Sequence, residues 1–339
     1  MKKVRKILYP ISVVYGQITK LRNKMFDKGI LKSTKFDIPV IVVGNLSVGG
    51  TGKTPQIEYL INLLQSNYKV AVLSRGYKRK SSGFIIADNS STAETIGDEP
   101  FQYYKKFKDI IVCVDADRVH AINRLKELEN PPEIILLDDA FQHRKVQGGL
   151  TILLTPYNDL YVDDTMLPSG NLRENIEGAE RAQVIIVTKC PTEVSEEEQY
   201  KIANRLNPTL SQTVFFSTVN YSDTIVTKER KISFEDVKEY KVLLLTGIAN
   251  PKPLVKFLER SRVDFEHLKY PDHYNFSPKD IRKIKSDFDK IDSDKKLILT
   301  TEKDYVRLNN MEDTWYLGIK VKFVNHGKHF DQLINNYVG

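Results

Sequence analysis

The chain has 339 residues, of which 41% are hydrophobic and 28% are charged, a composition typical of a globular protein. This length allows one large domain or two moderate ones, each with its own core. No apolar run reaches the roughly 18–20 residues that a membrane-spanning helix needs, and the N-terminus lacks the pattern of a cleavable signal peptide. Cys113 and Cys190 lie in apolar runs, so we expect buried free thiols in a reducing, cytoplasmic setting.

The net charge of +7 is concentrated at one end of the chain. Residues 1–35 contain ten Lys and Arg and a single acid, Asp27, so this arm carries +9 and the other 304 residues carry −2. A nearly neutral body indicates no nucleic-acid surface, and we expect no nucleic-acid partner.

The arm also has an apolar stripe of helical period. Pro10 is tolerated only in the first turn of a helix, so we expect a helix that begins near Tyr9. The stripe either packs on the protein's own core or, beside the basic residues, lies in the interface of an anionic membrane, and the charge favours the membrane. Steps of four and three residues separate the stripe's members, which are Ile7, Ile11, Val14, Ile18, Leu21 and Met25.

From Ile38 onward, short β-rich runs alternate with polar, helix-like segments. This alternation predicts an α/β fold with a parallel sheet and helices on both faces. The runs are Ile38–Val43, Val70–Leu73, Ile110–Val114, Ile134–Leu137, Thr151–Leu154 and Val184–Val187.

A second series of runs predicts a smaller α/β domain. Ser, Thr and Asp interrupt the apolar runs in residues 215–240, so we expect the two domains to join there. After the arm of residues 1–35, the expected domains are residues 36–220 and 221–339. The second series comprises Val242–Leu245, Phe265–Tyr270, Leu297–Thr300 and Trp315–Phe323.

The strongest chemical signal is the glycine-rich segment Gly44–Thr54, which follows the first strand and precedes a plausible helix over Gln56–Leu64. Such a loop lets backbone N–H groups converge on phosphate oxygens at a helix N-terminus. Lys53 would reach the β- and γ-phosphates, and the Thr54 hydroxyl would bind magnesium. Ser47 stands where the generic phosphate-loop pattern has a glycine.

A second signal is the apolar run Ile134–Leu137, which ends in Asp138 and Asp139. An acid at the end of a strand is the usual partner of a phosphate loop because its carboxylate holds magnesium or a water bound to magnesium. The polar cluster that follows, up to Arg144, falls at the carboxyl end of a strand, where open α/β sheets bind ligands.

Other polar segments allow more than one interpretation. The turn Gly97–Pro100 contains Asp98 and Glu99, which could supply a general base or a metal ligand, or could simply cap the next helix. Three further segments are similarly ambiguous: Ser74–Tyr77, Pro168–Glu174 and Pro271–Tyr274.

Together, these segments resemble the tetraacyldisaccharide 4′-kinase family, the lipid A kinases. The resemblance covers nearly the whole chain, and Ser47 belongs to the family's own loop. Ala140 replaces a Gly, Ser169 replaces a small residue that is usually Ala, and Asn175 replaces a Pro, all beside functional positions. The matching segments, in the expected order, are Gly44–Pro55, Ser74–Tyr77, Gly97–Pro100, Asp138–Arg144, Gly170–Glu174, Pro271–Tyr274 and Thr300–Asp304.

The resemblance implies transfer of the γ-phosphoryl group of ATP, with Mg²⁺, to the 4′-hydroxyl of a tetraacylated glucosamine disaccharide 1-phosphate, which forms lipid IVA. It implies that Asp98 is the general base, that His273 pairs with it, and that Lys53 is catalytic. Glu99 is either a metal ligand or a neighbour that supports one, and the cluster Thr301–Asp304 has no assigned role.

The remaining implied site residues fall into three groups. ATP would be bound by Gly49, Gly50, Thr51, Gly52, Lys53 and Thr54. Magnesium would be bound by Thr54, Asp138, Asp139 and Glu174. The polar head of the substrate would be held by Arg75, Arg118, Gln142, His143 and Arg173.

The resemblance further implies a peripheral protein at the cytoplasmic face of the inner membrane. Its partners would be the membrane-embedded acylated disaccharide and the anionic membrane surface, with no obligate protein partner.

Two other classes of protein share a phosphate loop. A GTPase or metallochaperone switch should carry a guanine-reading Asn-Lys-x-Asp motif, but the segment Val187–Cys190 lacks both the Asn and the Asp. A nucleic-acid-binding ATPase should have a basic body, which this chain does not have.

Overall fold

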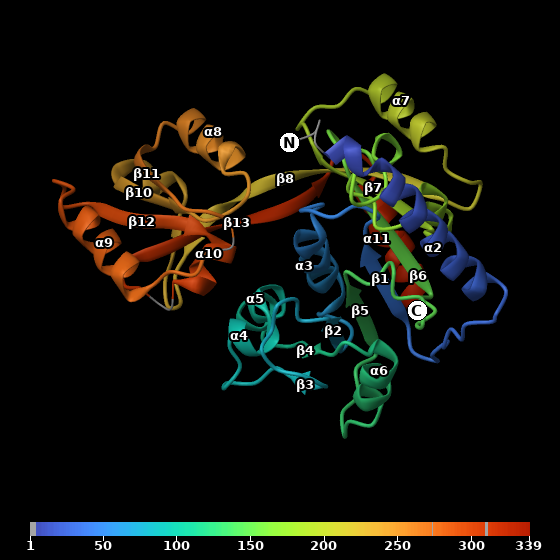
Figure 1. Cartoon of the computed structure of the whole chain (residues 1–339). Coiled ribbons are helices and arrows are strands. Elements are labelled where there is room, and N and C mark those ends of the chain that lie inside the picture. Colours follow the sequence, from blue (N-terminus) through green and yellow to red (C-terminus); the bar gives the residue numbers. More distant parts are fainter. Residues whose placement is uncertain (1–4, 273, 309–310) are drawn as a thin grey trace. The chain divides into compact units, whose positions relative to one another are not determined.

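The computed structural model describes residues 5–272, 274–308 and 311–339, which form two compact units (Figure 1). The first unit runs to Val219 and resumes at Val321, and the second spans Asn220–Lys320. The second domain expected from the sequence includes residues 321–339. The structure instead groups them with the first, because helix α11 (Gly327–Val338) buries Phe330 and Ile334 in that unit's core.

The first unit contains a largely parallel sheet with the strand order β3-β4-β2-β5-β1-β6-β7-β8. Strand β3 runs antiparallel to β4, and the other neighbours are parallel. All six predicted strands of this series are present, so the predicted α/β architecture is confirmed. The bounds are β1 Val40–Gly44, β2 Val70–Ser74, β3 Ile85–Ile86, β4 Ile111–Val114, β5 Ile134–Asp138, β6 Leu150–Pro156, β7 Val184–Cys190 and β8 Thr213–Val226.

Strand β8 was not predicted. The boundary between the two units, Val219/Asn220, falls in the segment 215–240 where we expect the domains to join, but residues 215–226 of that segment belong to a strand of 14 residues. Ser217 and Thr218 are buried in it although they are polar. Pairing with β7 satisfies the backbone there, so the strand does not need a continuous apolar run.

Helices cover both faces of this sheet because successive residues of each strand point to opposite sides. Ile41 and Val43 of β1 pack with α3 (Lys53–Leu64) and α11, while Val40 and Val42 pack on the opposite face with α6 (Arg118–Lys126). The other helical segments of the unit are α4 (Ala93–Ile96), α5 (Asp98–Lys106), α7 (Glu196–Leu206), η1 (Lys6–Leu8), η2 (Tyr161–Asp163) and η3 (Ile176–Arg181).

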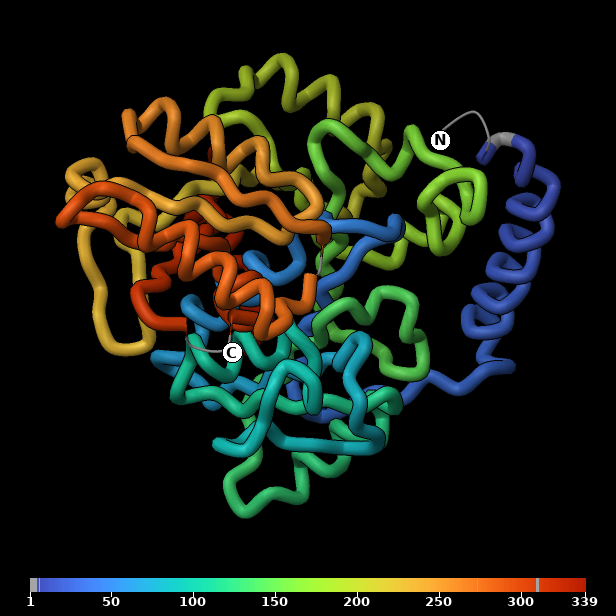
Figure 2. The backbone as a smooth tube through the Cα atoms, turned by 60° about the vertical axis from the view of Figure 1, so that its left-hand side comes forward, coloured from blue at the N-terminus to red at the C-terminus, as the bar shows by residue number. Residues whose placement is uncertain are grey.

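Helix α2 (Tyr9–Asp27) begins where Pro10 predicted. In Figure 2 it lies at the edge of the first unit. Its buried side chains are small or lie near its end: Ser12, Gly16 and Phe26. Five members of the apolar stripe are instead 56–77% exposed, so the interpretation that they pack on the protein's core is wrong: Ile7, Ile11, Val14, Ile18 and Leu21.

The second unit has the strand order β11-β10-β12-β13-β8, with β9 paired to β8, and all four predicted strands are present. Leu243 and Leu245 face α9, while Val242 and Leu244 face α8, so this sheet is also covered on both sides. The bounds are β9 Lys231–Ser233, η4 Glu235–Glu239, β10 Lys241–Thr246, α8 Lys252–Arg260, β11 Asp264–Lys269, α9 Pro278–Asp289, β12 Lys296–Thr301, α10 Glu302–Arg307 and β13 Thr314–Phe323.

The Thr301–Asp304 cluster has a clear local role in this unit. Thr301 caps α10 by accepting a hydrogen bond from the Asp304 backbone N–H at 3.2 Å. The buried Asp304 carboxylate accepts from the Thr301 hydroxyl at 2.8 Å and from the Gly247 N–H at 2.9 Å. The cluster therefore ties the end of β12 to the loop after β10.

Two further expectations concern the whole chain. Cys113 and Cys190 are free and buried, as predicted, and burial raises the pKa of both thiols. None of the helices formed by the described residues combines the length and the apolarity that crossing a bilayer requires.

Candidate active site

The predicted phosphate loop leads from β1 into α3. Gly52 precedes the helix with a φ of 96°, a backbone conformation that favours glycine. Lys53 and Thr54 then form the first turn of α3, so the loop ends at a helix N-terminus, the usual site for phosphate groups. The Thr51 hydroxyl oxygen is buried and has no hydrogen-bond partner among the described residues.

Two neighbouring segments hold this loop. The Thr188 hydroxyl donates to the Thr51 carbonyl at 2.7 Å, and the Lys189 amine donates to the Gly50 carbonyl. These residues belong to the segment that we compared with a guanine-reading motif, and here they support the loop. On its other side, the Val48 N–H donates to the Asn171 carbonyl at 2.8 Å.

Lys53, Asp139 and Arg173 meet at the loop. The Lys53 Nζ lies 3.6 Å and the Arg173 guanidinium 2.9 Å from Asp139 Oδ1. Burial alone would raise the pKa of Asp139, but Lys53 and Arg173 outweigh it, and the pKa is lowered. Asn45 is not among the predicted site residues; it is fully buried, and its Oδ1 accepts a hydrogen bond from Lys53 at 3.4 Å.

Asp138, at the end of β5, has a different environment. Burial and the neighbouring Asp139 raise the pKa of its carboxyl to about 7. Its Oδ2 accepts a hydrogen bond from the Tyr103 hydroxyl at 3.3 Å, whereas its buried Oδ1 has no partner within the described chain. A buried carboxylate oxygen with unused bonding capacity beside a phosphate loop suits a divalent cation.

This environment predicts an unusual pH dependence of stability. The Asp138 carboxyl has a pKa of about 7 in the folded chain and about 4 when unfolded. The folded state therefore holds a proton that the unfolded state releases between pH 4 and pH 7, and stability falls as the pH rises through that window. Asp138→Asn removes the effect, so we expect the variant to be more stable than wild type by roughly 2–4 kcal/mol at pH 8, with no difference below pH 4.

Urea unfolding at pH 4, 6 and 8, without nucleotide or metal, measures this difference. The exposed Glu94, changed to Gln, serves as the control and should follow the wild-type curve. Parallel curves for wild type and Asp138→Asn across the whole range would contradict the raised pKa.

Glu174 lies in a hydrogen-bond network with three other side chains. Its buried carboxylate accepts from the Arg181 guanidinium at 2.8 and 2.9 Å, from Gln142 Nε2 at 3.0 Å and from Asn23 Nδ2 at 2.8 Å. Neither Arg181 nor Asn23 was singled out from the sequence. Among the described residues, no group of three His, Cys, Asp or Glu side chains forms a ready-made metal site.

Helix α2 contacts this network with its polar side. The Tyr15 hydroxyl donates to the Arg173 carbonyl at 3.0 Å, and the Arg22 guanidinium donates to the Gln142 carbonyl at 2.8 Å. The helix that exposes the apolar stripe thus also contacts the backbone of two predicted site residues, Arg173 and Gln142.

Arg75, Arg118 and His143 lie within electrostatic range of one another or of the acidic pair. Arg118 is buried, its Nε has no partner among the described residues, and its charge acts together with Arg75, Asp138 and Asp139. Burial and Arg118 lower the pKa of His143 to about 4, so its imidazole is neutral at pH 7. Its buried Nε2 likewise lacks a partner within the described chain.

Asp98 and Glu99 form the first turn of α5, where both are half-buried. A helix N-terminus stabilises carboxylates, so this position also agrees with the capping interpretation. Glu99 acts electrostatically on Asp138. His273 lies outside the described residues.

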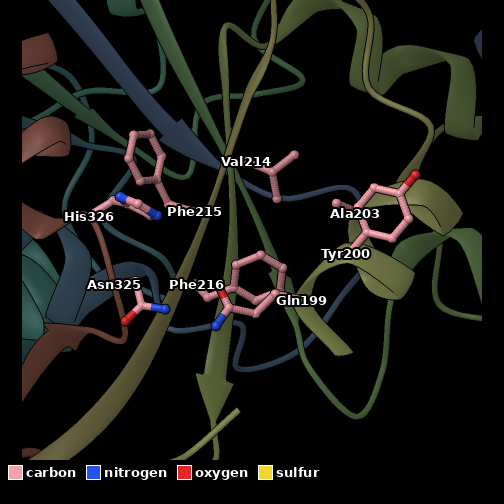
Figure 3. A pocket seen from close by; sticks show the side chains of 8 residues that line it. All are labelled: Gln199, Tyr200, Ala203, Val214, Phe215, Phe216, Asn325 and His326. Carbon is pink, nitrogen blue, oxygen red and sulfur yellow. The ribbon is translucent and has the colours of Figure 1, made fainter. Parts of the chain in front are cut away.

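A pocket of about 220 Å³ occurs elsewhere in the first unit, between α7, β8 and the loop before α11 (Figure 3). Tyr200, Phe215, Phe216 and His326 are among its lining residues, and none of the predicted site residues lines it.

Comparisons with known proteins agree over the whole chain. The sequence model of a family described as tetraacyldisaccharide-1-P 4′-kinase matches residues 4–338. A tetraacyldisaccharide 4′-kinase of Flavobacterium johnsoniae is 52% identical over 341 residues, which cover 100% of this chain and 98% of that protein. One of Flavobacterium psychrophilum is 54% identical over 344 residues, with the same coverage of 100% and 98%.

A solved structure is also similar. The crystal structure of LpxK from Aquifex aeolicus in complex with ATP matches with a TM-score of 0.80 and 32% sequence identity. The match covers 99% of this chain and 100% of that one.

Proposed function

Because the chain belongs to the tetraacyldisaccharide-1-P 4′-kinase family, we propose that it transfers the γ-phosphoryl group of ATP to the 4′-hydroxyl of a tetraacyldisaccharide 1-phosphate. The product is lipid IVA, in lipid A biosynthesis. The observation that carries the proposal is the grouping of Lys53, Asp139 and Arg173 at a phosphate loop.

The phosphate loop binds the triphosphate of ATP. Backbone N–H groups of Gly49–Gly52 and the N-terminus of α3 surround the phosphates, and Lys53 compensates the charge that develops during transfer. In the structure, Asp139 pairs with both Lys53 and Arg173. This keeps the two cations close to the loop before nucleotide binds.

Magnesium is proposed to lie at Thr54 and Asp138, with Asp139 beside them. The buried, unpartnered Asp138 Oδ1 fits a cation, and Mg²⁺ is usually held by one or two carboxylates together with substrate phosphates. The ion supplies charge neutralisation on the phosphates when it is bound. The Glu174 carboxylate accepts hydrogen bonds from Arg181, Gln142 and Asn23, so we propose that it links the segments around the site. A contact from Glu174 to magnesium stays a prediction.

Asp98 is proposed to accept the proton of the 4′-hydroxyl as the new P–O bond forms, with His273 as its partner. A sugar hydroxyl is a weak nucleophile, and a positioned general base accelerates such a step by about 10²–10⁴. The polar head of the substrate would be gripped by Arg75, Arg118, Gln142, His143 and Arg173. The buried Arg118 Nε and His143 Nε2 have no hydrogen-bond partner among the described residues, which supports a ligand near them.

We further propose that the protein binds the cytoplasmic face of the inner membrane through α2. The exposed stripe presents apolar side chains, and residues 1–35 add a net charge of +9. A substrate with four acyl chains resides in the bilayer, so an enzyme that acts on it needs access to that surface.

This proposal predicts two components of membrane binding. Basic residues near an anionic leaflet contribute about 1 kcal/mol each, and salt screens this term; burial of the stripe adds a salt-resistant term. We expect the protein to sediment with anionic vesicles, to be partly released by high salt, and to need detergent for full release. Replacing Ile11, Val14 and Ile18 with Ser should remove the salt-resistant fraction.

The matched control is Leu210→Ser, which removes a fully exposed leucine outside the stripe and should leave sedimentation unchanged. Wild-type protein that stays in the supernatant with anionic vesicles at low salt would refute membrane binding by this helix.

ATP turnover measured with different activators separates this function from its rivals. We expect turnover to depend on the acylated disaccharide 1-phosphate and to be unaffected by DNA, RNA or candidate protein partners. Turnover that a nucleic acid or a protein stimulates, with the lipid inert, would favour one of the other phosphate-loop classes.

A further inference from the structure

Helix α5, which carries Asp98, is held by both apolar and polar contacts. It is nine residues long, and its buried side chains are Pro100, Gln102 and Tyr103. The ring of Phe107, which directly follows the helix, is also buried in the core, and Tyr104 packs against it. Polar contacts add to this apolar anchoring.

A single buried carboxylate supplies two of those contacts. Glu58 lies on α3 and is 6% exposed. The Lys106 Nζ lies 2.7 Å from Glu58 Oε2, and Gln102 Nε2 donates to Glu58 Oε1 at 2.9 Å. Gln102 lies in the middle of α5 and Lys106 is its last residue. Hydrogen bonds to a charged, buried group are among the stronger ones.

Glu58 also belongs to the helix that presents the phosphate-binding side chains. It follows Thr54 by four residues, so it lies on the same side of α3 one turn later. The contact from Glu58 to α5 therefore links the helix of Lys53 and Thr54 directly to the helix of Asp98.

Two more contacts restrict α5. The fully buried Tyr103 donates its hydroxyl to Asp138 Oδ2 at 3.3 Å. At the other end, Gly97 has a φ of 95°, and a Cβ there would lie 3.1 Å from the Gly76 Cα. The amino end of α5 thus abuts the backbone of the Ser74–Tyr77 segment, and Glu58 holds its carboxyl end.

We propose that Glu58 is a positioning residue for phosphoryl transfer. By holding Gln102 and Lys106, it fixes α5, and with it Asp98, relative to the phosphate loop. This inference rests on the proposed function, because it assumes that Asp98 acts in the reaction. A misplacement of about 1 Å at a reacting group costs about 100-fold in rate.

The test compares kcat and the KM for ATP in Glu58→Ala with those of wild type. We expect kcat to fall about 10- to 100-fold while the KM for ATP stays within about threefold, because Lys53 and the loop are unchanged. Glu58→Gln keeps an acceptor for Gln102 and should recover much of the loss. Lys106→Gln leaves Glu58 and Gln102 in place, so its kcat should fall less than that of Glu58→Ala. This milder variant keeps the inference testable if Glu58→Ala fails to fold.

A second background identifies the residue through which Glu58 acts. In an Asp98→Ala chain, assayed with enzyme in excess, adding Glu58→Ala should change the residual rate by less than about threefold, since the group to be positioned is gone. Glu94→Ala breaks the exposed ion pair with Lys80 and should leave the kinetics unchanged.

Three results would overturn the inference. Equal losses from Glu58→Ala with and without Asp98 would mean that Glu58 acts on the fold as a whole. A raised KM for ATP at unchanged kcat would mean that it supports nucleotide binding. If Asp98→Ala alone turned over as fast as wild type, Asp98 would not be the general base of the proposed function. This result can be told apart from a failure of the Glu58 inference, because the Asp98→Ala variant leaves Glu58 intact.

Discussion

Replacing Lys53 with Ala is expected to reduce phosphoryl transfer by about 10³-fold or more while the fold stays intact. The side chain is 17% exposed and contacts Asn45 and Asp139 rather than any apolar cluster. Its removal deprives the transferring phosphates of a cation that is held in place at the phosphate loop. Arg173 remains paired with Asp139, so the acid does not become an isolated buried charge.

Steady-state kinetics and thermal unfolding of the purified variant measure these two effects. Lys126→Ala, which removes a lysine paired with Asp37 away from the loop, should leave turnover unchanged. Near-normal kcat in a folded Lys53→Ala protein would remove the phosphate loop from the mechanism.

The second large effect concerns Asp98 and His273. Asp98→Ala and His273→Ala are each expected to lower kcat by about 10²–10⁴, the range of general-base catalysis. Residues that act in one step show strongly non-additive losses. The double variant should therefore be little slower than the more damaging single variant.

Comparing kcat of the two single variants and the double variant provides the measurement. His267→Ala is a suitable control, because that histidine pairs with the Thr246 hydroxyl at 2.8 Å and has no assigned role. Losses that simply multiply would show that the two residues do not work as a pair, even if each of them matters.

Most parallel strands of both units could be predicted because buried parallel strands require apolar runs. Strand β8 escaped prediction because Ser217, Thr218 and Ser222 interrupt its run, and its pairing with β7 is a long-range contact. The sequence also did not predict that residues 321–339 belong to the first unit. The residues that Phe330 packs against, such as Tyr59, lie far away in the sequence.

The apolar stripe of α2 could be recognised by its period, but its environment could not. Periodicity shows that Ile11, Val14 and Ile18 share a face and leaves open what that face contacts. The structure leaves these side chains exposed and packs Ser12 and Gly16 against the unit instead. Small residues carry no sequence signal for such a contact.

Some residues of the site could be predicted from local motifs, and others could not. Lys53, Asp138 and Asp139 lie in local motifs whose chemistry is evident from neighbouring residues. Asn45 contacts Arg173, which is 128 positions away. Arg181 contacts Glu174, seven positions earlier, but the spacing matches no motif of a site, so the sequence predicts neither contact. Arg173 was recognised by resemblance, but its pairing with Asp139 is a tertiary contact.

The central claim is that this chain phosphorylates an acylated disaccharide. Incubation of the purified protein with Mg²⁺, the disaccharide 1-phosphate and ATP labelled in its γ-phosphoryl group, followed by mass spectrometry of the lipid, tests it most directly. We predict a lipid that has gained one labelled phosphoryl group on the 4′-oxygen, and no such product with Lys53→Ala. An unmodified lipid in the presence of ATP hydrolysis, or a label on any other oxygen, would contradict the account.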